Sequence, residues 1–199
     1  MPTSPGPLQV LVVAGSLNRQ SSTRAVLLLA CDALRAGGAA VDLLDLSAEP
    51  LPLFNTDTTY AQGYYPALKG RVAAADVLLL GSPDYHGCMS SALKNFLDHF
   101  WTEFAGKLFA SVVASHDKGL TVTDQIRTAA RQCYAWVLPY AVAFADKTDV
   151  TDGQIISEPF QQRLQAMTCD LLTYGPLLAA QRRADLAGTA PGFLARYRK

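Results

Sequence analysis

The stretch LQVLVVAGSLNRQSST, residues 8–23, decides the fold. Residues 8–14 are apolar almost without interruption and rich in valine, which is typical of a strand covered on both faces in a parallel sheet. The polar segment 15–23 follows at once. From Thr23 onward, apolar residues at 26, 29, 30 and 34 show the spacing of an amphipathic helix. A buried strand, a polar turn and a helix in this order indicate the first part of an α/β domain.

The rest of the chain repeats this alternation. Buried apolar runs occupy residues 76–81 and 108–114, a weaker run occupies 40–44, and a fifth apolar segment covers 136–144. Pro139 marks a break or an edge position in that last segment. Helical patterns cover residues 23–36, 66–75, 90–104, 123–134 and 159–174. Because strands and helices alternate without a repeat or a linker, we expect one doubly wound domain with right-handed crossovers.

Composition excludes several classes of protein. The 199 residues carry 17 basic and 17 acidic side chains, so clustered positive charge for a nucleic-acid partner is missing. No apolar stretch approaches the roughly 20 residues that span a bilayer, and residues 1–7 do not resemble a secretory signal. The four cysteines have no metal-binding spacing. We therefore expect a cytoplasmic protein with reduced thiols, no metal and no membrane partner.

The polar turn GSLNRQSST, residues 15–23, has the chemistry of an anion cradle. Backbone N–H groups and the positive end of the helix dipole meet there, and short polar side chains add donors. These side chains are Ser16, Asn18, Ser21, Ser22 and Thr23, with Arg19 adding charge. The alternative is that Ser21 or Ser22 only caps the helix. The turn lacks both GxGxxG and GK[ST], and GxSxG occurs nowhere, which favours a terminal phosphate over a pyrophosphate, a nucleoside triphosphate or an α/β-hydrolase.

The third strand leads into a second polar segment, SPDYHGCMS, residues 82–90. Pro83 and Gly87 shape a tight loop, and Tyr85 offers a flat aromatic face. In a doubly wound sheet, the loops after the first and third strands meet at the topological switch point, where ligands bind. A phosphate cradle beside an aromatic loop predicts a mononucleotide site.

These motifs resemble those of the NADPH-dependent FMN reductase family. The family's phosphate loop, GSxRxxSxN, is matched by Gly15, Ser16 and Ser21. Asn18 stands at the family arginine, with Arg19 beside it, and Thr23 stands at the family asparagine. The second motif, PEYxxxxxxALKNxxD, is matched by PDY at 83–85, ALKN at 92–95 and Asp98, with Asp84 in place of glutamate. The third, glycine-rich loop corresponds to SHDKG at 115–119, where only the Lys-Gly end matches. The resemblance covers about residues 8–170.

The resemblance implies a flavodoxin-like fold with a five-stranded parallel sheet in the order 2-1-3-4-5 and helices on both faces. We expect the domain to span residues 8–180, between a flexible segment at 1–7 and a C-terminal tail at 181–199. It implies FMN as cofactor and NAD(P)H as co-substrate, with hydride chemistry at the flavin N5 and no catalytic side chain. The acceptor would be a small molecule, whether a quinone, an azo compound, a metal ion or free flavin.

The cofactor-binding residues follow from the same matches. The phosphate would be held by the cradle residues Ser16, Asn18, Arg19, Ser21, Ser22 and Thr23. The ring system would lie along Pro83, Asp84, Tyr85, His86 and Gly87, and near Ser115, His116 and Lys118. For Lys118 the alternative is a solvated side chain, and Cys88 beside the loop is expected to be a packed thiol rather than a redox group.

Three further expectations concern surfaces. The segment has aromatic residues at 96, 100, 101 and 104, which is more than a single apolar stripe facing the core would contain. We therefore expect a second apolar face that contacts a partner. Family members are commonly dimers or tetramers, and we expect a homodimer or homotetramer with His99 at the interface or surface. The long connection at 48–65 is expected to act as a lid or a binding wall.

Two other functions compete with the reductase. A flavodoxin-type carrier binds FMN but takes electrons from protein partners; such carriers are strongly acidic, whereas this chain is neutral. A non-redox module that binds another phosphorylated ligand is the second alternative, and it would lack a flavin absorbance.

Overall fold

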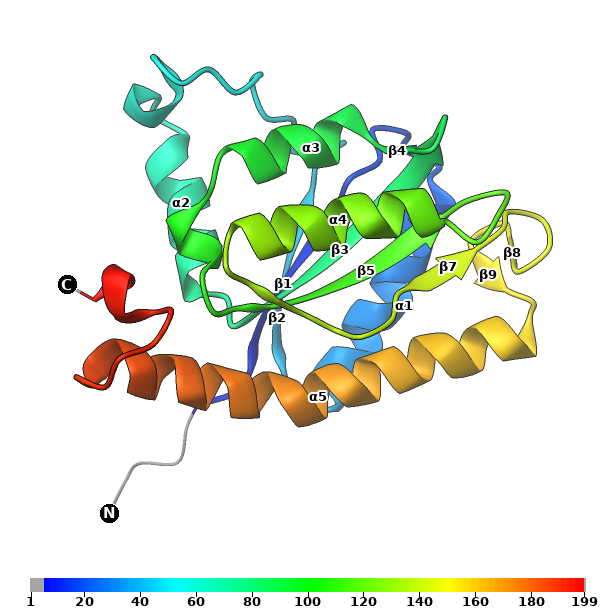
Figure 1. Cartoon of the computed structure of the whole chain (residues 1–199). Helices are drawn as coiled ribbons and strands as arrows, with labels where there is room; N and C mark the ends of the chain where they lie inside the picture. The colour runs from blue at the N-terminus through cyan, green and yellow to red at the C-terminus, as the bar shows by residue number, and fades with distance from the viewer. Residues whose placement is uncertain (1–5, 199) are drawn as a thin grey trace.

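A computed structural model describes residues 6–198, so most of the expected flexible segment at 1–7 and the last residue of the expected tail lie outside the described part. A central parallel sheet has the strand order β2-β1-β3-β5-β6 (Figure 1). Its strands are β1 (Gln9–Ala14), β2 (Ala40–Asp45), β3 (Val77–Tyr85), β5 (Leu108–Ala114), β6 (Trp136–Val137) and β7 (Val142–Phe144). The five parallel positions follow the expected order.

The fifth position of the sheet is divided. β6 pairs with β5 at Leu108 and Phe109, whereas β7 pairs with β5 farther along, from Val112 to Ala114. Pro139 lies in the gap between the two short strands, which confirms the predicted break. A short strand not expected from the sequence, β4 (Cys88–Met89), runs antiparallel to the end of β3.

Helices cover both faces of the sheet (Figure 1). On one face lie α1 (Ser22–Ala36) and α5 (Glu158–Ala187), and on the other lie α2 (Tyr65–Ala74), α3 (Ser91–Asp98) and α4 (Leu120–Gln132). Along β1, Val10 and Val12 pack towards the first pair of helices, and Leu11 and Val13 pack towards the other three. Both faces of the strand are therefore buried, which is why its sequence hardly alternates.

The helix expected over residues 90–104 is shorter, and one inference from it is wrong. It ends at Asp98, and a 3₁₀ turn covers Thr102–Phe104. Phe96, Phe100 and Phe104 all lie in the core, and only Trp101 is exposed. Phe96 faces the core from α3, and the turn after Asp98 brings Phe100 and Phe104 into the same core, so the three rings do not form a second, outward apolar face.

His99 is also not a surface residue, because its side chain is only 1% exposed. One ring nitrogen lies 2.7 Å from the carbonyl oxygen of Asn95, and the other lies 3.0 Å from the hydroxyl of Tyr64. Phe54 packs against the same ring. His99 thus joins α3 to the connection at 48–65, which includes a 3₁₀ turn at Thr59–Ala61.

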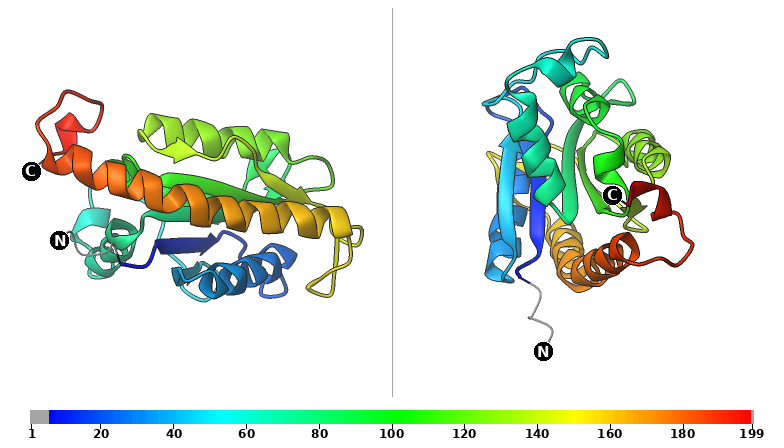
Figure 2. Two further views of the ribbon diagram at one scale, coloured as in Figure 1. Left: turned by 90° about the horizontal axis from the view of Figure 1, so that it is seen from below. Right: turned by 90° about the vertical axis from the view of Figure 1, so that its left-hand side faces the viewer.

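The last helix is longer than the sequence pattern indicated. α5 continues past Tyr174 to Ala187, and the domain boundary expected at residue 180 falls inside it. It crosses the sheet and reaches a short 3₁₀ turn at Ala195–Tyr197 (Figure 2). Near its C-terminal end, Arg182 donates a hydrogen bond to the carbonyl of Ala105. Within residues 6–198, no helix has the length and apolar character needed to cross a bilayer.

Candidate functional site

A cavity of about 250 Å³ opens at the carboxyl ends of β1, β3, β5 and β7. This edge is where the chain leaves β1 and β3 in opposite directions, the position at which doubly wound sheets bind ligands. The cavity is lined by Ser16, Asn18, Gln20, Ser21, Ser22, Thr23, Pro83, Asp84, Tyr85, Ala114, Ser115, His116 and Asp146. The two motifs singled out in the sequence therefore meet in one hollow.

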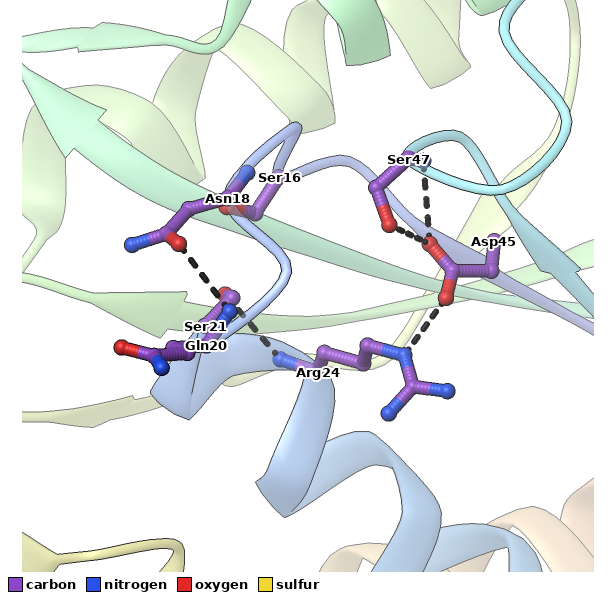
Figure 3. A network of polar contacts seen from close by, with 7 residues as sticks. All are labelled: Ser16, Asn18, Gln20, Ser21, Arg24, Asp45 and Ser47. Atoms are coloured by element: carbon purple, nitrogen blue, oxygen red, sulfur yellow. Dashed lines mark hydrogen bonds and ion pairs between the residues drawn. The ribbon is translucent and has the colours of Figure 1, made fainter.

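The turn after β1 is folded by its own side chains (Figure 3). Ser16 Oγ accepts from the amide of Asn18 at 3.3 Å, and Asn18 Oδ1 accepts from the amide of Gln20 at 3.0 Å. Ser21 caps α1 by accepting from the amide of Arg24 at 3.3 Å. Because the hydroxyls of Ser16 and Ser21 accept these bonds, their protons remain available for a ligand. Capping and anion binding are thus compatible at this helix start.

Gly15 sets how closely the turn approaches β3. Its amide donates to the carbonyl of Gly81 at 2.9 Å, and its own carbonyl accepts from Ser90 Oγ at 2.5 Å. A Cβ at position 15 would lie 2.6 Å from the Gly81 oxygen and 2.8 Å from Leu93 Cβ. Only glycine leaves room for this contact, which brings the cradle beside the end of β3.

Arg24 and Asp45 form an ion pair beside the cradle that sequence reasoning did not anticipate. Arg24 Nε lies 2.5 Å from Asp45 Oδ2, while Ser47 donates to Asp45 Oδ1 from its hydroxyl at 2.8 Å and from its amide at 3.0 Å (Figure 3). Burial tends to raise the pKa of the Asp45 carboxyl, but the hydrogen bonds from Arg24 and Ser47 outweigh it and hold that pKa below its ordinary value. The ion pair of Arg24 with Asp45 thus holds the end of β2 against α1.

The PDY motif continues into a β-hairpin. His86 and Gly87 both have positive φ, 59° and 77°, as in a two-residue primed turn between β3 and β4. Gln125 on α4 clamps this turn: its Oε1 accepts from the amide of Met89 at 3.0 Å, and its Nε2 donates to the carbonyl of Gly87 at 2.9 Å. Tyr85, 52% exposed, stands at the cavity wall. The predicted tight loop is confirmed, with an aromatic face beside the hollow.

Asp84 joins this hairpin to the loop after β5. Its Oδ1 accepts from the amide of Gly87 at 2.8 Å, and its Oδ2 accepts from the hydroxyl of Ser115 at 2.9 Å. The same hydroxyl oxygen accepts from the amide of Asp117 at 3.2 Å. The 115–119 segment, which lacks the family glycines at 115–117, is therefore held to the hairpin through a side-chain carboxylate.

The structure brings most of the predicted site residues to the cavity, but not all of them. Arg19 lies in neighbouring hollows, His86 and Gly87 form the hairpin turn, and the exposed Lys118 is not on the cavity lining. Gln20, Ala114 and Asp146 line the cavity and were not predicted. Ala114 and Asp146 stand at and just after the carboxyl ends of β5 and β7, so the strand-end rule applied to every strand would have found them. Among residues 6–198, no cluster of three His, Cys, Asp or Glu side chains could hold a metal ion.

The fold and the site define a flavodoxin-like protein with a polar cavity at the switch point. The sequence model of the family described as NADPH-dependent FMN reductase matches residues 8–149, and the chain belongs to this family. The chain is thus an oxidoreductase that uses FMN, with NAD(P)H as co-substrate.

Individual relatives agree with the family assignment. The chain is 30% identical over 152 residues to an NADPH azoreductase of Bacillus sp. (strain OY1-2), covering 74% of this chain and 82% of the relative. It is also 30% identical over 178 residues to an NAD(P)H-dependent FMN reductase of Pseudomonas aeruginosa, covering 80% and 93%. Among solved structures, the flavoenzyme FerB of Paracoccus denitrificans superposes with a TM-score of 0.68 at 18% identity, covering 85% of this chain and 98% of that one. A flavodoxin from the Archaea superposes with a TM-score of 0.61 at 13% identity, covering 85% and 99%.

Proposed function

We propose that this oxidoreductase holds FMN in the switch-point cavity and reduces a small organic acceptor, a quinone or an azo compound. The observation that carries the proposal is the meeting of two elements in one hollow: the hydroxyl-rich start of α1 and the hairpin that presents Tyr85. The residues proposed to hold the cofactor are those predicted from the motifs that also line this hollow: Ser16, Asn18, Ser21, Ser22, Thr23, Pro83, Asp84, Tyr85, Ser115 and His116.

The donor set suits a phosphate monoester. The hydroxyls of Ser16 and Ser21 keep their protons for an acceptor, and Ser22 and Thr23 occupy the first turn of α1, where backbone N–H groups have no partner within the helix. The close approach enforced by Gly15 leaves the cradle beside β3. These features support binding of the FMN phosphate by the 15–23 turn.

The cavity has a volume of about 250 Å³, close to the lower end of the roughly 300–1,000 Å³ of small-molecule and cofactor sites. When bound, FMN supplies the hydride chemistry that passes reducing equivalents from NAD(P)H to the acceptor. The chain's own residues position it: Asp84 and Ser115 lock the two loops together, and Gln125 fixes the hairpin.

The acceptor class is proposed from the relatives. An NADPH azoreductase matches most of the chain, and a probable NADPH:quinone oxidoreductase of Oryza sativa is 37% identical over 101 residues, about half of each protein. An FMN electron carrier is the second candidate, because the archaeal flavodoxin shares the fold. The zero formal charge speaks against it, since such carriers dock through acidic surfaces.

We also propose a homodimer or homotetramer. With Phe96, Phe100 and Phe104 assigned to the core, the exposed apolar side chains that support this proposal are Leu17 and Leu53, which line a separate hollow, Leu120 at the start of α4, and Trp101. Light scattering should give at least twice the 21.4 kDa chain mass at micromolar concentration. A monomer mass would contradict this proposal.

The function is tested by combining cofactor binding with turnover. FMN fluorescence should be quenched on titration with the apoprotein, and the loaded protein should oxidise NADPH in the presence of a quinone or an azo dye. An electron carrier would bind FMN but oxidise no NADPH. Absence of FMN binding would contradict both.

A further inference from the structure

A second cavity, of about 820 Å³, adjoins the cofactor cavity on the side of α1. Its walls are the first turns of α1 and the hairpin formed by β8 (Val150–Thr151) and β9 (Gln154–Ile155), which lies outside the main sheet. The hairpin runs close beside α1 in two views (Figures 1 and 2), and a Cβ at Gly153 would lie 3.3 Å from Ala25 Cβ. We call this cavity the α1–hairpin groove.

The groove is continuous with the cofactor cavity. Gln20, Ser21, Ser22 and Asp146 line both hollows. A ligand in the groove would therefore end beside the cradle proposed for the FMN phosphate. Its volume falls within the roughly 300–1,000 Å³ typical of sites for small molecules and cofactors.

The charges on the groove are mixed in a way that suits a phosphorylated nucleoside. Arg24 is paired with Asp45, whereas Arg19 and Lys147 take part in no ion pair within residues 6–198. Asp146 and Asp152 also line the groove. Two cations that form no ion pair can bind a phosphate, and carboxylates can accept hydrogen bonds from ribose hydroxyls. A bare inorganic anion would use only the first of these.

We propose that the α1–hairpin groove binds the adenosine end of NADPH, and that Arg19 and Lys147 contact its 2′-phosphate. The proposal rests on the proposed function, because it requires FMN in the neighbouring cavity. It deepens that function by assigning the residues that distinguish NADPH from NADH. No dinucleotide fingerprint in the sequence supplies this discrimination. An arginine placed beside the ribose is the usual protein device for accepting a 2′-phosphate.

The test compares two probes that differ only in the 2′-phosphate. FMN-loaded protein is titrated calorimetrically with 2′,5′-ADP and with 5′-AMP, in the wild type and in Arg19→Gln and Lys147→Gln variants. The wild type should bind 2′,5′-ADP about tenfold or more tightly than 5′-AMP, and each single variant should lose about threefold or more of that preference. The ratio of kcat/KM for NADPH to that for NADH should fall in parallel. Arg127→Gln is the matched control, because Arg127 is an exposed arginine on α4 away from the groove.

The outcomes separate this proposal from the proposed function. Equal affinities for the two probes, or variants with an unchanged NADPH-to-NADH ratio, would overturn the groove assignment while leaving the reductase intact. If Arg19→Gln weakens FMN binding but leaves the ratio unchanged, Arg19 belongs to the cofactor site and the assignment to the groove is wrong. Failure to bind FMN or to oxidise either nucleotide would instead contradict the proposed function.

Discussion

Ser115 donates a hydrogen bond from its hydroxyl to Asp84 Oδ2 at 2.9 Å, joining the loop after β5 to the hairpin after β3. The other carboxylate oxygen of Asp84 holds the amide of Gly87. One short side chain thus fixes the relative position of two loops that line the cavity. The family motif has a glutamate at this position, so the aspartate brings the two loops together through a side chain that is shorter by one methylene.

Replacing Asp84 should weaken FMN binding as well as lower the stability of the fold. Asp84→Ala removes both acceptors, at a cost of about 1–3 kcal/mol, and we expect FMN affinity to fall about tenfold or more. Asp84→Asn keeps an acceptor for the Gly87 amide and should retain more of the affinity. FMN fluorescence quenching measures the effect, with the exposed Asp124→Ala on α4 as control. Equal FMN affinity in the wild type and in Asp84→Ala would contradict the bracing role.

Replacement by alanine should have opposite effects on stability at Gly15 and at Gly70. Gly15→Ala would place a Cβ 2.6 Å from the Gly81 carbonyl oxygen, so the protein should lose several kcal/mol of unfolding free energy, or fold with a displaced cradle. Gly70 lies inside α2, and a Cβ there meets nothing within 4 Å. Gly70→Ala should therefore stabilise the protein by about 0.5–1 kcal/mol. Urea denaturation measures both, and a neutral Gly15→Ala would show that the close approach is dispensable.

Asn95 holds the 48–65 connection against α3. Its Oδ1 accepts from the amide of Phe54 at 2.8 Å, and its Nδ2 donates to the carbonyls of Leu51 and Pro52. Asn95→Ala should release this segment, with faster hydrogen exchange and proteolysis at residues 50–62 and a loss of about 1–3 kcal/mol. The neighbouring Lys94→Ala removes only an exposed pair with Asp98 and should change neither. Unchanged exchange rates in Asn95→Ala would mean that the His99 and Tyr64 contact alone retains the segment.

The sheet and the cavity could be predicted from the sequence because their signals are local. The run at 8–14 is apolar on both strand faces, and the polar turn that follows it cannot be buried without a ligand or a cap. Pro139 predicted the division of the fifth strand, because proline has no backbone N–H to donate to a neighbouring strand. The convergence of the 15–23 and 83–88 segments then followed from sheet topology.

Other features depend on contacts that are distant in sequence. The Gly175-Pro176 pair is typical of a helix end, yet α5 passes through it because Gly175 lies directly against Leu8 and Val77, where a Cβ would fall 2.9 Å from a Leu8 methyl. His99 is buried because the 48–65 connection folds over it. The spacing of apolar residues in α3 cannot predict that contact, because the connection comes from another part of the chain. The β8–β9 hairpin is too short to leave a strand pattern.

Lys107, the residue before β5, is a buried side chain whose ammonium group donates to backbone carbonyls. Its side chain is almost fully buried, and Nζ donates to the carbonyls of Ala73 and Ala75 at the end of α2. Burial, reinforced by the nearby charge of Arg182, lowers the pKa of Lys107 to about 7, although Asp76 and Glu103 act in the opposite direction. No ion pair with a carboxylate compensates this group among the described residues.

This lowered pKa gives the unfolding free energy a defined pH dependence. In the unfolded chain the lysine keeps its proton up to its ordinary pKa near 10.5, whereas the folded protein releases it near 7. The unfolded state therefore binds more protons between these values, and stability gains up to about 1.4 kcal/mol per pH unit from this group as pH rises through that window. Lys107→Met should remove that gain, so its unfolding free energy, measured in urea from pH 6.5 to 9.5, should rise less steeply than that of the wild type. Loss of the donor to the Ala73 and Ala75 carbonyls adds a destabilising contribution that does not change this slope. The exposed Lys94→Met should keep the wild-type slope, and parallel slopes for Lys107→Met and the wild type would show that the buried amine remains charged throughout.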